Sequence, residues 1–375
     1  MLNDAFGLIY AGEQNMKLIE LVSKRAIGAL PIGGRYRAID FQLSNMVNSG
    51  IRNVGVVAEK NYHSLMDHLG SGKEWDLNRK NDGLFILPPF DTAESRGSFR
   101  GLCDAVKNSM SYIHRAKQQY CLLTGSYTIY NMTYNDLIDF HIEKNADVTI
   151  LYNEERGIPS DADRFKDLRL YFNEDGLVTD MEFNSMMPNS SCVGMDAYLL
   201  RKDLLEYLVA DALSRGKYSF VSDVLMPNVN RLKIYGYKHE GYVGRLTSVA
   251  SYFKLNMDMI NIDVQRELFH TGHPIYTKIK DAVPAKYDNS ANVKNSIVAN
   301  GCVIEGNVEN CVLFRSVYIG KGSTVKDSVI MQDSEIYQNC WIENGILDKQ
   351  VHVRSGRRLI GNENYPVIIK KGAVV

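Results

Sequence analysis

Apolar and polar positions follow two different periods along this chain. Through about residue 260, short apolar segments alternate with segments of helical period. This alternation is typical of an α/β domain built on a largely parallel sheet. The expected strands are residues 6–10, 54–58, 121–124, 148–152 and 197–200, with a hairpin added at 168–172 and 177–181. The expected helices are residues 40–47, 103–117, 134–143 with Thr133 as its cap, and 249–262.

The period changes in the last quarter of the chain, where apolar residues recur in steps of five or six. The recurring residues are Val298, Val303, Val308, Leu313, Ile319, Val325, Ile330, Ile336, Ile342, Leu347 and Val353. Turn-forming residues lie between them, so each apolar residue is expected to point into a left-handed parallel β-helix of hexapeptide repeats. We therefore predict an α/β domain at residues 1–265, a linker at 266–289 and a β-helix at 290–375.

Composition and charge narrow the classes of function. The 375 residues are 45% hydrophobic, enough for two cores, and 43 basic and 44 acidic residues leave a net charge of -1. Such a surface does not attract nucleic acid or an anionic membrane, and no apolar run reaches the roughly 18 residues of a membrane span. The six cysteines lack metal-site spacing, which favours a reducing compartment. We expect a cytoplasmic protein with no nucleic-acid or membrane partner.

Several stretches resemble motifs of ADP-glucose pyrophosphorylase. They are K-R-A at 24–26, G-G-R-Y-R-A-I-D-F-Q-L-S-N at 33–45, V-N-S-G-I-R at 47–52, G-K-E-W-D-L at 72–77, L-P-P at 87–89, R-G-L-C-D-A-V at 100–106 and Y-F-K-L-N-M-D at 252–258. With the β-helix, the resemblance covers almost the whole chain. It implies a nucleotidyltransferase domain of the Rossmann-like, GT-A type with a mixed sheet. It also implies a chemistry that joins a nucleotide to a sugar phosphate and releases pyrophosphate.

That chemistry depends on backbone donors, cations and Mg²⁺ around the triphosphate, and here the resemblance breaks down. The family's G-G-x-G-T-R-L loop corresponds to residues 12–18, which keep Gly12 but replace a glycine with Glu13 and the arginine with Lys17. Glu13 would repel a phosphate by about 4 kcal/mol per charge pair at 4 Å. The lysine of the family's K-P-A segment corresponds to Ile27.

The metal-binding positions of the family are also changed. Its two metal aspartates correspond to Ser126 and Arg245, and its E-K-P segment finds no clear match at residues 181–188. No metal cofactor is therefore expected, although the family uses Mg²⁺. Gly101, Asp104 and Asp196 complete the candidate pocket, which the resemblance implies is degenerate. Asp104 also fits a purely structural role at the start of a helix.

A basic set surrounds the Gly33-Gly34 turn and is a candidate site for an anion. Its members are Lys24, Arg25, Arg35, Arg37 and Arg52. In the family, basic residues of this segment contribute to a site for phosphorylated regulators. The alternative is a solvated charged surface with salt bridges to neighbours such as Asp40.

The histidines suggest weaker alternatives. His63 and His68 lie five positions apart, so a helical metal pair is disfavoured and surface or interface positions are expected. His352 within the β-helix leaves open an acyltransferase, although no pantetheine-groove signal accompanies it.

Taken together, the replaced residues resemble the non-catalytic, GlgD-type partner subunit of this family. The resemblance implies a hetero-oligomer with a catalytic homologue, most simply a tetramer. Phe314, Tyr318, Tyr337 and Trp341 on the β-helix are the expected anchors of that contact. The alternative is a weakly active glucose-1-phosphate adenylyltransferase, or another sugar-1-phosphate nucleotidyltransferase.

Overall fold

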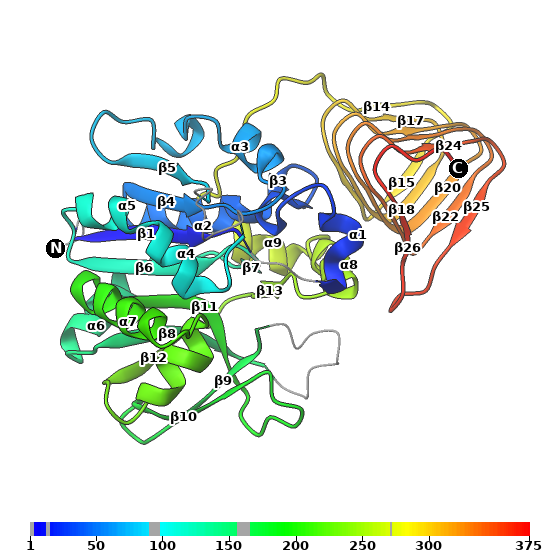
Figure 1. The fold of residues 1–375 in the computed structure, drawn as a ribbon. Coiled ribbons are helices and arrows are strands. Elements are labelled where there is room, and N and C mark those ends of the chain that lie inside the picture. Colours follow the sequence, from blue (N-terminus) through cyan, green and yellow to red (C-terminus); the bar gives the residue numbers. More distant parts are fainter. Residues whose placement is uncertain (1–3, 13–15, 90–97, 156–165, 271) are drawn as a thin grey trace.

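A nine-stranded mixed sheet forms the centre of the first domain in the computed structural model, which describes residues 4–12, 16–89, 98–155, 166–270 and 272–375 (Figure 1). Its main path runs β10-β9-β11-β6-β1-β4-β5, and β8 joins β12 to β11. β1, β4, β5 and β6 are parallel, whereas β11 is antiparallel to its neighbours. The strands are β1 (Ala5–Tyr10), β4 (Asn53–Val57), β5 (Gly83–Leu87), β6 (Tyr120–Gly125), β8 (Val148–Glu154), β9 (Leu168–Phe172), β10 (Val178–Phe183), β11 (Cys192–Arg201) and β12 (Ile234–Lys238).

Helices cover both faces at the centre of this sheet, so β1 and β4 are buried at every position rather than alternating, whereas β10 at the edge exposes Thr179 and Asp180. In β1, Phe6 and Leu8 pack beneath α4, α5 and α7, while Ile9 faces α2 and α6. The helices of this domain are α1 (Ile19–Val22), α2 (Ala38–Asn48), α3 (His63–Leu69), α4 (Leu102–Asn108), α5 (Met110–Arg115), α6 (Asn135–Glu143) and α7 (Lys202–Ser214). The mixed-sheet fold predicted from the sequence is confirmed.

Three of the expected helices differ in detail. The helix expected at 103–117 is divided at Ser109, whose hydroxyl bonds back to the carbonyl of Ala105 at 2.9 Å. Thr133 does not cap α6, because Tyr134 occupies the cap position and its N–H donates to Ser49 Oγ at 2.7 Å. The helix expected at 249–262 is two helices, α8 (Val249–Asp258) and α9 (Ile262–Phe269).

The second domain is a parallel β-helix whose inward side chains form three columns. Equivalent inward residues are 15 positions apart in the first coils, as in Val298 and Leu313, and 17 apart in later ones, as in Val308 and Val325. One prediction was wrong: Val303 pairs with Tyr318 on the outer side, and the buried residue of that coil is Ile304. One sheet contains β14 (Lys286–Tyr287), β17 (Val303–Ile304), β19 (Tyr318–Ile319), β21 (Glu335–Ile336) and β24 (His352–Val353). The other contains β15 (Asn292–Lys294), β16 (Ile297–Val298), β18 (Asn307–Leu313), β20 (Thr324–Ile330), β22 (Trp341–Glu343), β23 (Gly345–Leu347), β25 (Arg358–Ile360) and β26 (Val367–Ile369).

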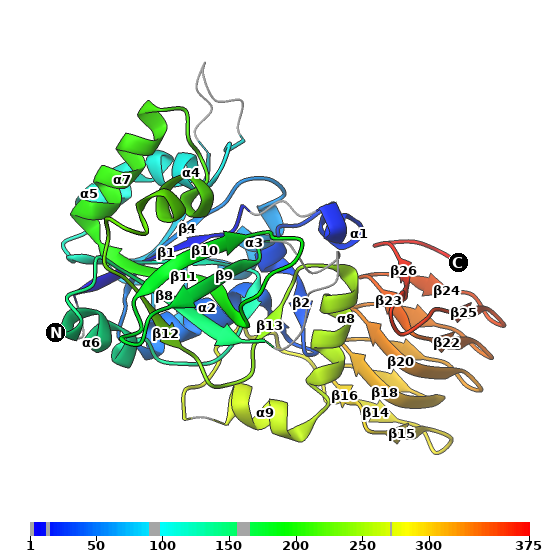
Figure 2. The ribbon, with the colours of Figure 1, turned by 90° about the horizontal axis from the view of Figure 1, so that it is seen from below.

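The two domains share a core along α8, which lies against β18 and β20 (Figure 2). Val312, Val329 and Ile346 of the β-helix pack there with Phe253 and Leu255. The segment between regular elements is shorter than the linker expected at 266–289, because α9 ends at Phe269 and β14 begins at Lys286. None of the helices in the described part of the chain is both apolar enough and long enough to cross a bilayer.

Candidate functional site

The two positions matched to metal aspartates lie on neighbouring segments at the carboxyl end of β6. Ser126 follows β6 directly and is buried. The next strand, β7 (Thr128–Ile129), pairs with β13 (Gly244–Arg245), so Thr128 lies opposite Arg245. The segment containing Ile27 reaches the same place, because a Cβ on Gly28 would lie 3.2 Å from Ser126 Oγ. The fold therefore brings three of the replaced segments together.

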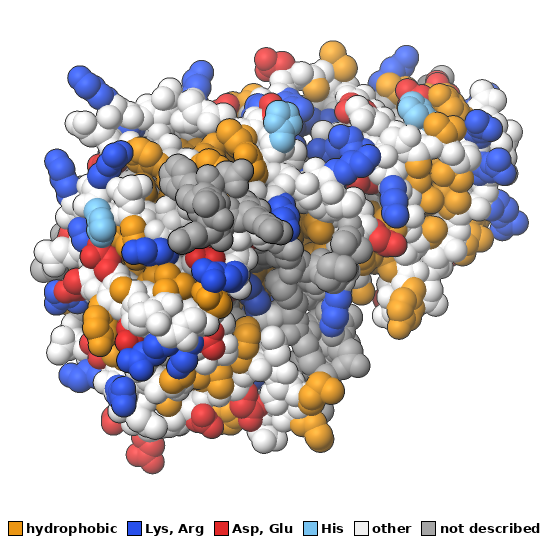
Figure 3. Space-filling view, in the orientation of Figure 1, with side chains coloured by type: hydrophobic (Ala, Val, Ile, Leu, Met, Phe, Trp, Pro, Cys, Tyr) orange, Lys and Arg blue, Asp and Glu red, His pale blue; other side chains and the backbone are white. Residues whose placement is uncertain are grey.

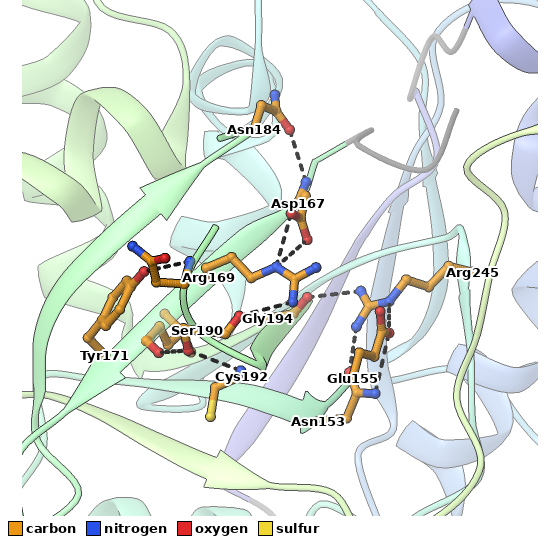
Figure 4. Close-up of polar contacts among 12 residues, drawn as sticks. Asn153, Glu155, Asp167, Arg169, Tyr171, Asn184, Ser190, Cys192, Gly194 and Arg245 are labelled. Carbon is orange, nitrogen blue, oxygen red and sulfur yellow. Dashed lines mark hydrogen bonds and ion pairs between the residues drawn. The ribbon is translucent and has the colours of Figure 1, made fainter. Parts of the chain in front are cut away.

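Arg245 is held by three acceptors in this pocket (Figure 4). Its Nε donates to Glu155 Oε1 at 2.7 Å, its Nη1 to the carbonyl of Gly194 at 3.0 Å, and its Nη2 to Asn153 Oδ1. Burial works to raise the pKa of Glu155, but the charge and hydrogen bond of Arg245 outweigh it and hold that pKa below its ordinary value. Only 13% of the Arg245 side chain is exposed. The guanidinium is thus a fixed part of the wall.

A second ion pair lies at Asp196, a buried residue in the left-handed backbone region with φ 53°. Its carboxylate accepts from Tyr198 Oη and from Lys166 Nζ, both at 3.2 Å. The same ammonium lies 5.5 Å from the ring centroid of Tyr10 and 5.1 Å from that of Tyr127. Lys166 and Asp196 therefore neutralise each other next to the end of β1.

The phosphate-loop positions lie beside a carboxylate that the sequence analysis missed. Glu59 is buried, and its Oε2 would be 2.9 Å from a Cβ on Gly12. Tyr10 Oη donates to the same carboxylate at 3.1 Å. Glu13 lies outside the described residues, and Lys17 is exposed in a short 3-10 helix at Met16–Leu18. The sequence contained a signal for this contact: Gly12 and Glu59 follow β1 and β4, and neighbouring parallel strands end at the same edge of the sheet.

Gly101 and Asp104 form contacts that stabilise the start of α4. A Cβ on Gly101 would lie 2.5 Å from the carbonyl oxygen of Tyr218, so this close approach requires glycine. Asp104 accepts from the backbone N–H and Nε of Arg100, both at 3.2 Å. The guanidinium of Arg100 in turn lies 4.1 Å from the ring centroid of Tyr218. These contacts favour the structural alternative for Asp104.

The structure separates the five members of the predicted basic set. Arg25 is buried and forms a bidentate ion pair with Asp348 of the β-helix at 2.7 and 2.8 Å, so it is committed to the domain junction. Arg52 follows the far end of α2, about 16 Å along that 11-residue helix from Arg37. Lys24 is exposed. Of the five, only Arg35 and Arg37 line a common recess in the described structure. Burial and the nearby charge of Arg25 lower the pKa of Arg37, but the guanidinium of Arg25 is bound by Asp348.

Arg35 and Arg37 line a small recess at the junction of the two domains, together with cations that the sequence analysis missed. These are Lys278 and Lys280 of the linker and Arg315 of the β-helix. Figure 3 shows Lys and Arg side chains gathered at this junction. Arg37 Nη1 donates to the carbonyl of Ala29 at 2.8 Å, so its charge is fixed in place. No sequence period could have indicated that linker and β-helix cations meet here.

Burial and neighbouring positive charges lower the pKa values of Arg315 and Lys349. Burial lowers the pKa of Arg315, and the charge of Arg35 adds to that effect. Burial, together with the charges of Arg37 and Arg25, lowers the pKa of Lys349 to about 7. In the described parts of the chain, no carboxylate lies within ion-pair distance of Arg35, Arg315 or Lys349. Lys278 is paired with Asp67, and the charge of Asp40 partly offsets the burial that lowers the pKa values of Arg37 and Arg315, so the positive charge of the recess is only partly compensated.

The two other histidine expectations are resolved by their contacts. His68 is buried rather than exposed, and its Nε2 lies 2.5 Å from Asp40 Oδ1, below the recess. His63 is exposed at the start of α3, so the two imidazoles do not form a metal pair. His352 Nδ1 lies 3.2 Å from Glu335 Oε2 on the outer face of the β-helix.

Comparisons with known proteins agree with this division of the chain. Residues 6–258 match the family described as Nucleotidyl transferase, and residues 281–365 match the GlmU-like, C-terminal hexapeptide family. The chain is 35% identical to the glycogen biosynthesis protein GlgD of Bacillus subtilis, over 99% of this chain and 97% of that protein. The corresponding protein of Geobacillus stearothermophilus is 40% identical, over 100% and 98%. A glucose-1-phosphate adenylyltransferase of Acetivibrio thermocellus is 34% identical, over 98% and 86%.

The chain belongs to the family of GlgD proteins and glucose-1-phosphate adenylyltransferases. Within this family the pocket can be tested for the Mg²⁺ that the resemblance implies. Proteins hold Mg²⁺ mainly through carboxylates, whereas the two matched positions hold the neutral hydroxyl of Ser126 and the positively charged guanidinium of Arg245. The described residues also contain no group of three His, Cys, Asp or Glu side chains placed to hold a metal. The residues present do not fit this ion.

Proposed function

We propose that this chain is a regulatory, catalytically deficient subunit of ADP-glucose pyrophosphorylase that acts in glycogen biosynthesis. The observation that carries the proposal is the Arg245 clamp on Asn153, Glu155 and Gly194. A cation fixed at this position opposes a divalent metal, and the buried Glu59 carboxylate beside Gly12 opposes a phosphate. The fold around the pocket is retained although its chemistry is not, which suits a subunit that assembles with an active homologue.

The recess at the domain junction supports the regulatory part of this proposal. Arg35 and Arg37 of the first domain and Arg315 of the β-helix line the recess, and the buried Lys349 lies close enough to Arg37 for their charges to interact. In the described structure none of these four side chains forms an ion pair with a carboxylate. An anion with several oxygens would relieve their mutual repulsion and form charge-assisted hydrogen bonds. We infer that the recess binds a phosphorylated metabolite and thereby links the two domains.

Sulfate binding should strengthen as the pH falls from 9 towards 7. The Lys349 ammonium is largely lost above its pKa of about 7, and a bound anion raises that pKa. Binding then takes up a proton, so the affinity rises by at most about tenfold per pH unit and levels off below pH 7. Sulfate is the suitable probe because it stays doubly charged over this range. Isothermal titration in two buffers of different ionisation enthalpy measures both the affinity and the proton uptake.

Three variants give this measurement its controls. Lys349→Met should remove the pH dependence, whereas Lys217→Met, at an exposed lysine after α7, should leave it intact. Arg35→Gln combined with Arg315→Gln should weaken binding by about 2–4 kcal/mol at every pH, through the loss of two charge-assisted bonds. Unchanged sulfate affinity in that double variant would show that the recess is not the site.

One of the four aromatic residues expected to anchor the subunit contact is not available for it. Phe314 is only 2% exposed because it lies in the core shared by the two domains. Tyr337 remains 38% exposed, with its hydroxyl donating to Glu335, and Tyr318 and Trp341 are half-buried. These three side chains remain available for the contact with a catalytic homologue that we propose.

A mixture of this chain with an active glucose-1-phosphate adenylyltransferase from the same source should form a hetero-oligomer, most simply a tetramer. Light scattering coupled to gel filtration measures its mass, and the homologue's response to effectors should change on mixing. Tyr337→Ala should weaken the assembly, and Tyr207→Ala, at a 67% exposed tyrosine of α7, serves as its control. Separate elution at micromolar concentration with unaltered kinetics would contradict the regulatory-subunit proposal.

A further inference from the structure

A groove separates the outer side of α8 from one corner of the β-helix. Its β-helix wall contains Asn295, Asn310, Asp327 and Asn344, one from each of four successive coils. Its other wall contains Ser251, Lys254, Asp258 and Asn261, and the loop between β25 and β26 closes one end. Figure 3 shows the outline of the molecule indented between the two domains. The same hollow continues to Asn153, Glu155 and Arg245 of the degenerate pocket, but the β-helix wall and the β25–β26 loop take no part in that pocket or in the basic recess.

The β-helix wall is a ladder of planar polar side chains. All four residues have φ between 42° and 50°, a conformation that Asn and Asp tolerate at the corner of each coil. Asn295 Nδ2 donates to Asn310 Oδ1 at 2.7 Å, and Asn310 Nδ2 donates to Asp327 Oδ1 at 3.1 Å. The ladder stops there, because the side chain of Asn344 has no partner among the described residues. The coils repeat at about 4.8 Å, so donors and acceptors recur at fixed intervals.

An exposed aromatic ring lies beside the end of this ladder. Tyr365 is 84% exposed, more than any other large hydrophobic side chain in the described structure. Its backbone is nevertheless held, since Tyr365 N donates to the carbonyl of Asn362 at 2.9 Å and Asn362 N donates back at 3.1 Å. Figure 1 shows the connection between β25 and β26 projecting from the coils. A ring on a fixed loop at the mouth of a polar groove is suited to stacking on a flat ligand.

The charges beside the ladder and the β25–β26 loop disfavour an anionic ligand. Asp258, Asp327 and Glu363 outnumber Lys254 here, whereas the other cations of the hollow, Lys17, Lys166 and Arg245, belong to the segments of the degenerate pocket. A phosphorylated ligand would be repelled here, whereas hydroxyl groups can donate to carboxylates and to amide oxygens. Apolar side chains such as the partly exposed Met257 and Ile260 lie between these polar groups. A pyranose ring combines the two matching features, since its hydroxyl groups border apolar C–H faces.

We propose that this groove binds a neutral oligosaccharide, with one sugar ring stacked on Tyr365 and its hydroxyls bonded to the ladder. The choice of α-linked glucose as the sugar rests on the proposed function in glycogen biosynthesis. Bound glucan would hold the subunit next to the polymer whose precursor its partner makes. No covalent step is involved, and the site works by contact alone.

Titration of the full chain with maltoheptaose tests the site, and electrophoresis in gels containing glycogen provides an independent measurement. Tyr365→Ala should weaken binding about tenfold, the value for a lost aromatic stack of about 1.4 kcal/mol. Asn344→Gly should weaken it as well, and glycine tolerates the positive φ at this corner. Tyr287→Ala, at a 52% exposed tyrosine of β14 outside the groove, should leave binding unchanged.

Equal affinity of the native chain and Tyr365→Ala for maltoheptaose, or no binding by either, overturns the proposal. If Tyr365→Ala instead loses assembly with the catalytic homologue while glucan binding persists, the groove is a subunit contact and the proposal also fails. Assembly that survives while glucan binding is lost supports it. Because assembly and glucan binding are measured separately, a chain that assembles without binding maltoheptaose refutes this inference and leaves the proposed function standing.

Discussion

The isolated chain, supplied with ATP, glucose-1-phosphate and Mg²⁺, should release no pyrophosphate above the background. Metal and cations that stabilise the phosphoryl charge provide most of the rate in such a transfer. Here Arg245 and Ser126 stand at the matched metal positions, and a buried carboxylate, Glu59, lies next to Gly12. A typical enzyme turns over on the order of 10 times per second. A rate within about a hundredfold of that value would contradict the proposal that the pocket is catalytically deficient.

Restoring single metal positions should not recover this activity. Ser126→Asp leaves the Arg245 guanidinium in place, and Arg245→Asp leaves Ser126 without a carboxylate and sets a new anion beside Glu155. Residues that act as one unit in catalysis fail together, so each single variant should stay at background. Thermal unfolding of both variants shows whether the fold is intact, and a coupled pyrophosphate assay measures the rate. Recovery in either one would mean that a single lost carboxylate accounts for the deficiency.

The sequence was sufficient for the strands that contain a continuous buried apolar run. The positions of β1, β4, β6 and β8 are confirmed within about two residues, whereas β11 begins at Cys192, before the expected start at residue 197. β12 was missed because it contains Gly236 and two tyrosines and pairs with β8 at the edge of the sheet. α7 was also missed, although its buried Leu205, Leu208 and Val209 carry a helical period.

The sequence indicated which residues belong to the candidate sites, but not which side chains contact one another there. The resemblance indicated which residues had been replaced, yet not that Arg245 binds Glu155 across 90 positions of the chain. The basic set was grouped by closeness in sequence, whereas the recess is also lined by Lys278, Lys280 and Arg315 from distant segments. These contacts depend on how the two domains pack together, and the hydrophobic period within a segment does not indicate that packing.

Asp348→Asn should be one of the most destabilising polar substitutions in this chain, at about 3–5 kcal/mol. Asp348 and Arg25 are each 4% exposed and join the two domains across 323 positions. Removing the carboxylate leaves Arg25 buried without its partner, and Lys349 also loses the anion that partly offsets the lowering of its pKa by burial, while Arg37 remains close to both. The midpoint and slope of urea unfolding measure the loss. Asp211→Asn, which breaks an exposed pair with Arg215, should produce no measurable change.

Arg25→Met should cost less than Asp348→Asn, although both break the same ion pair. With Arg25 gone, one of the charges that lowers the pKa of Lys349 disappears while Asp348 still raises it, so Lys349 becomes protonated and partly replaces the lost cation. The difference between the two variants should shrink as the pH rises well above 7, because Lys349 then stays neutral. Sulfate should restore part of the stability of Asp348→Asn, since an anion in the recess replaces the missing charge. Equal losses in both variants at pH 7, unaffected by sulfate, would mean that Asp348 stabilises only its own pair and that the neighbouring cations do not act together.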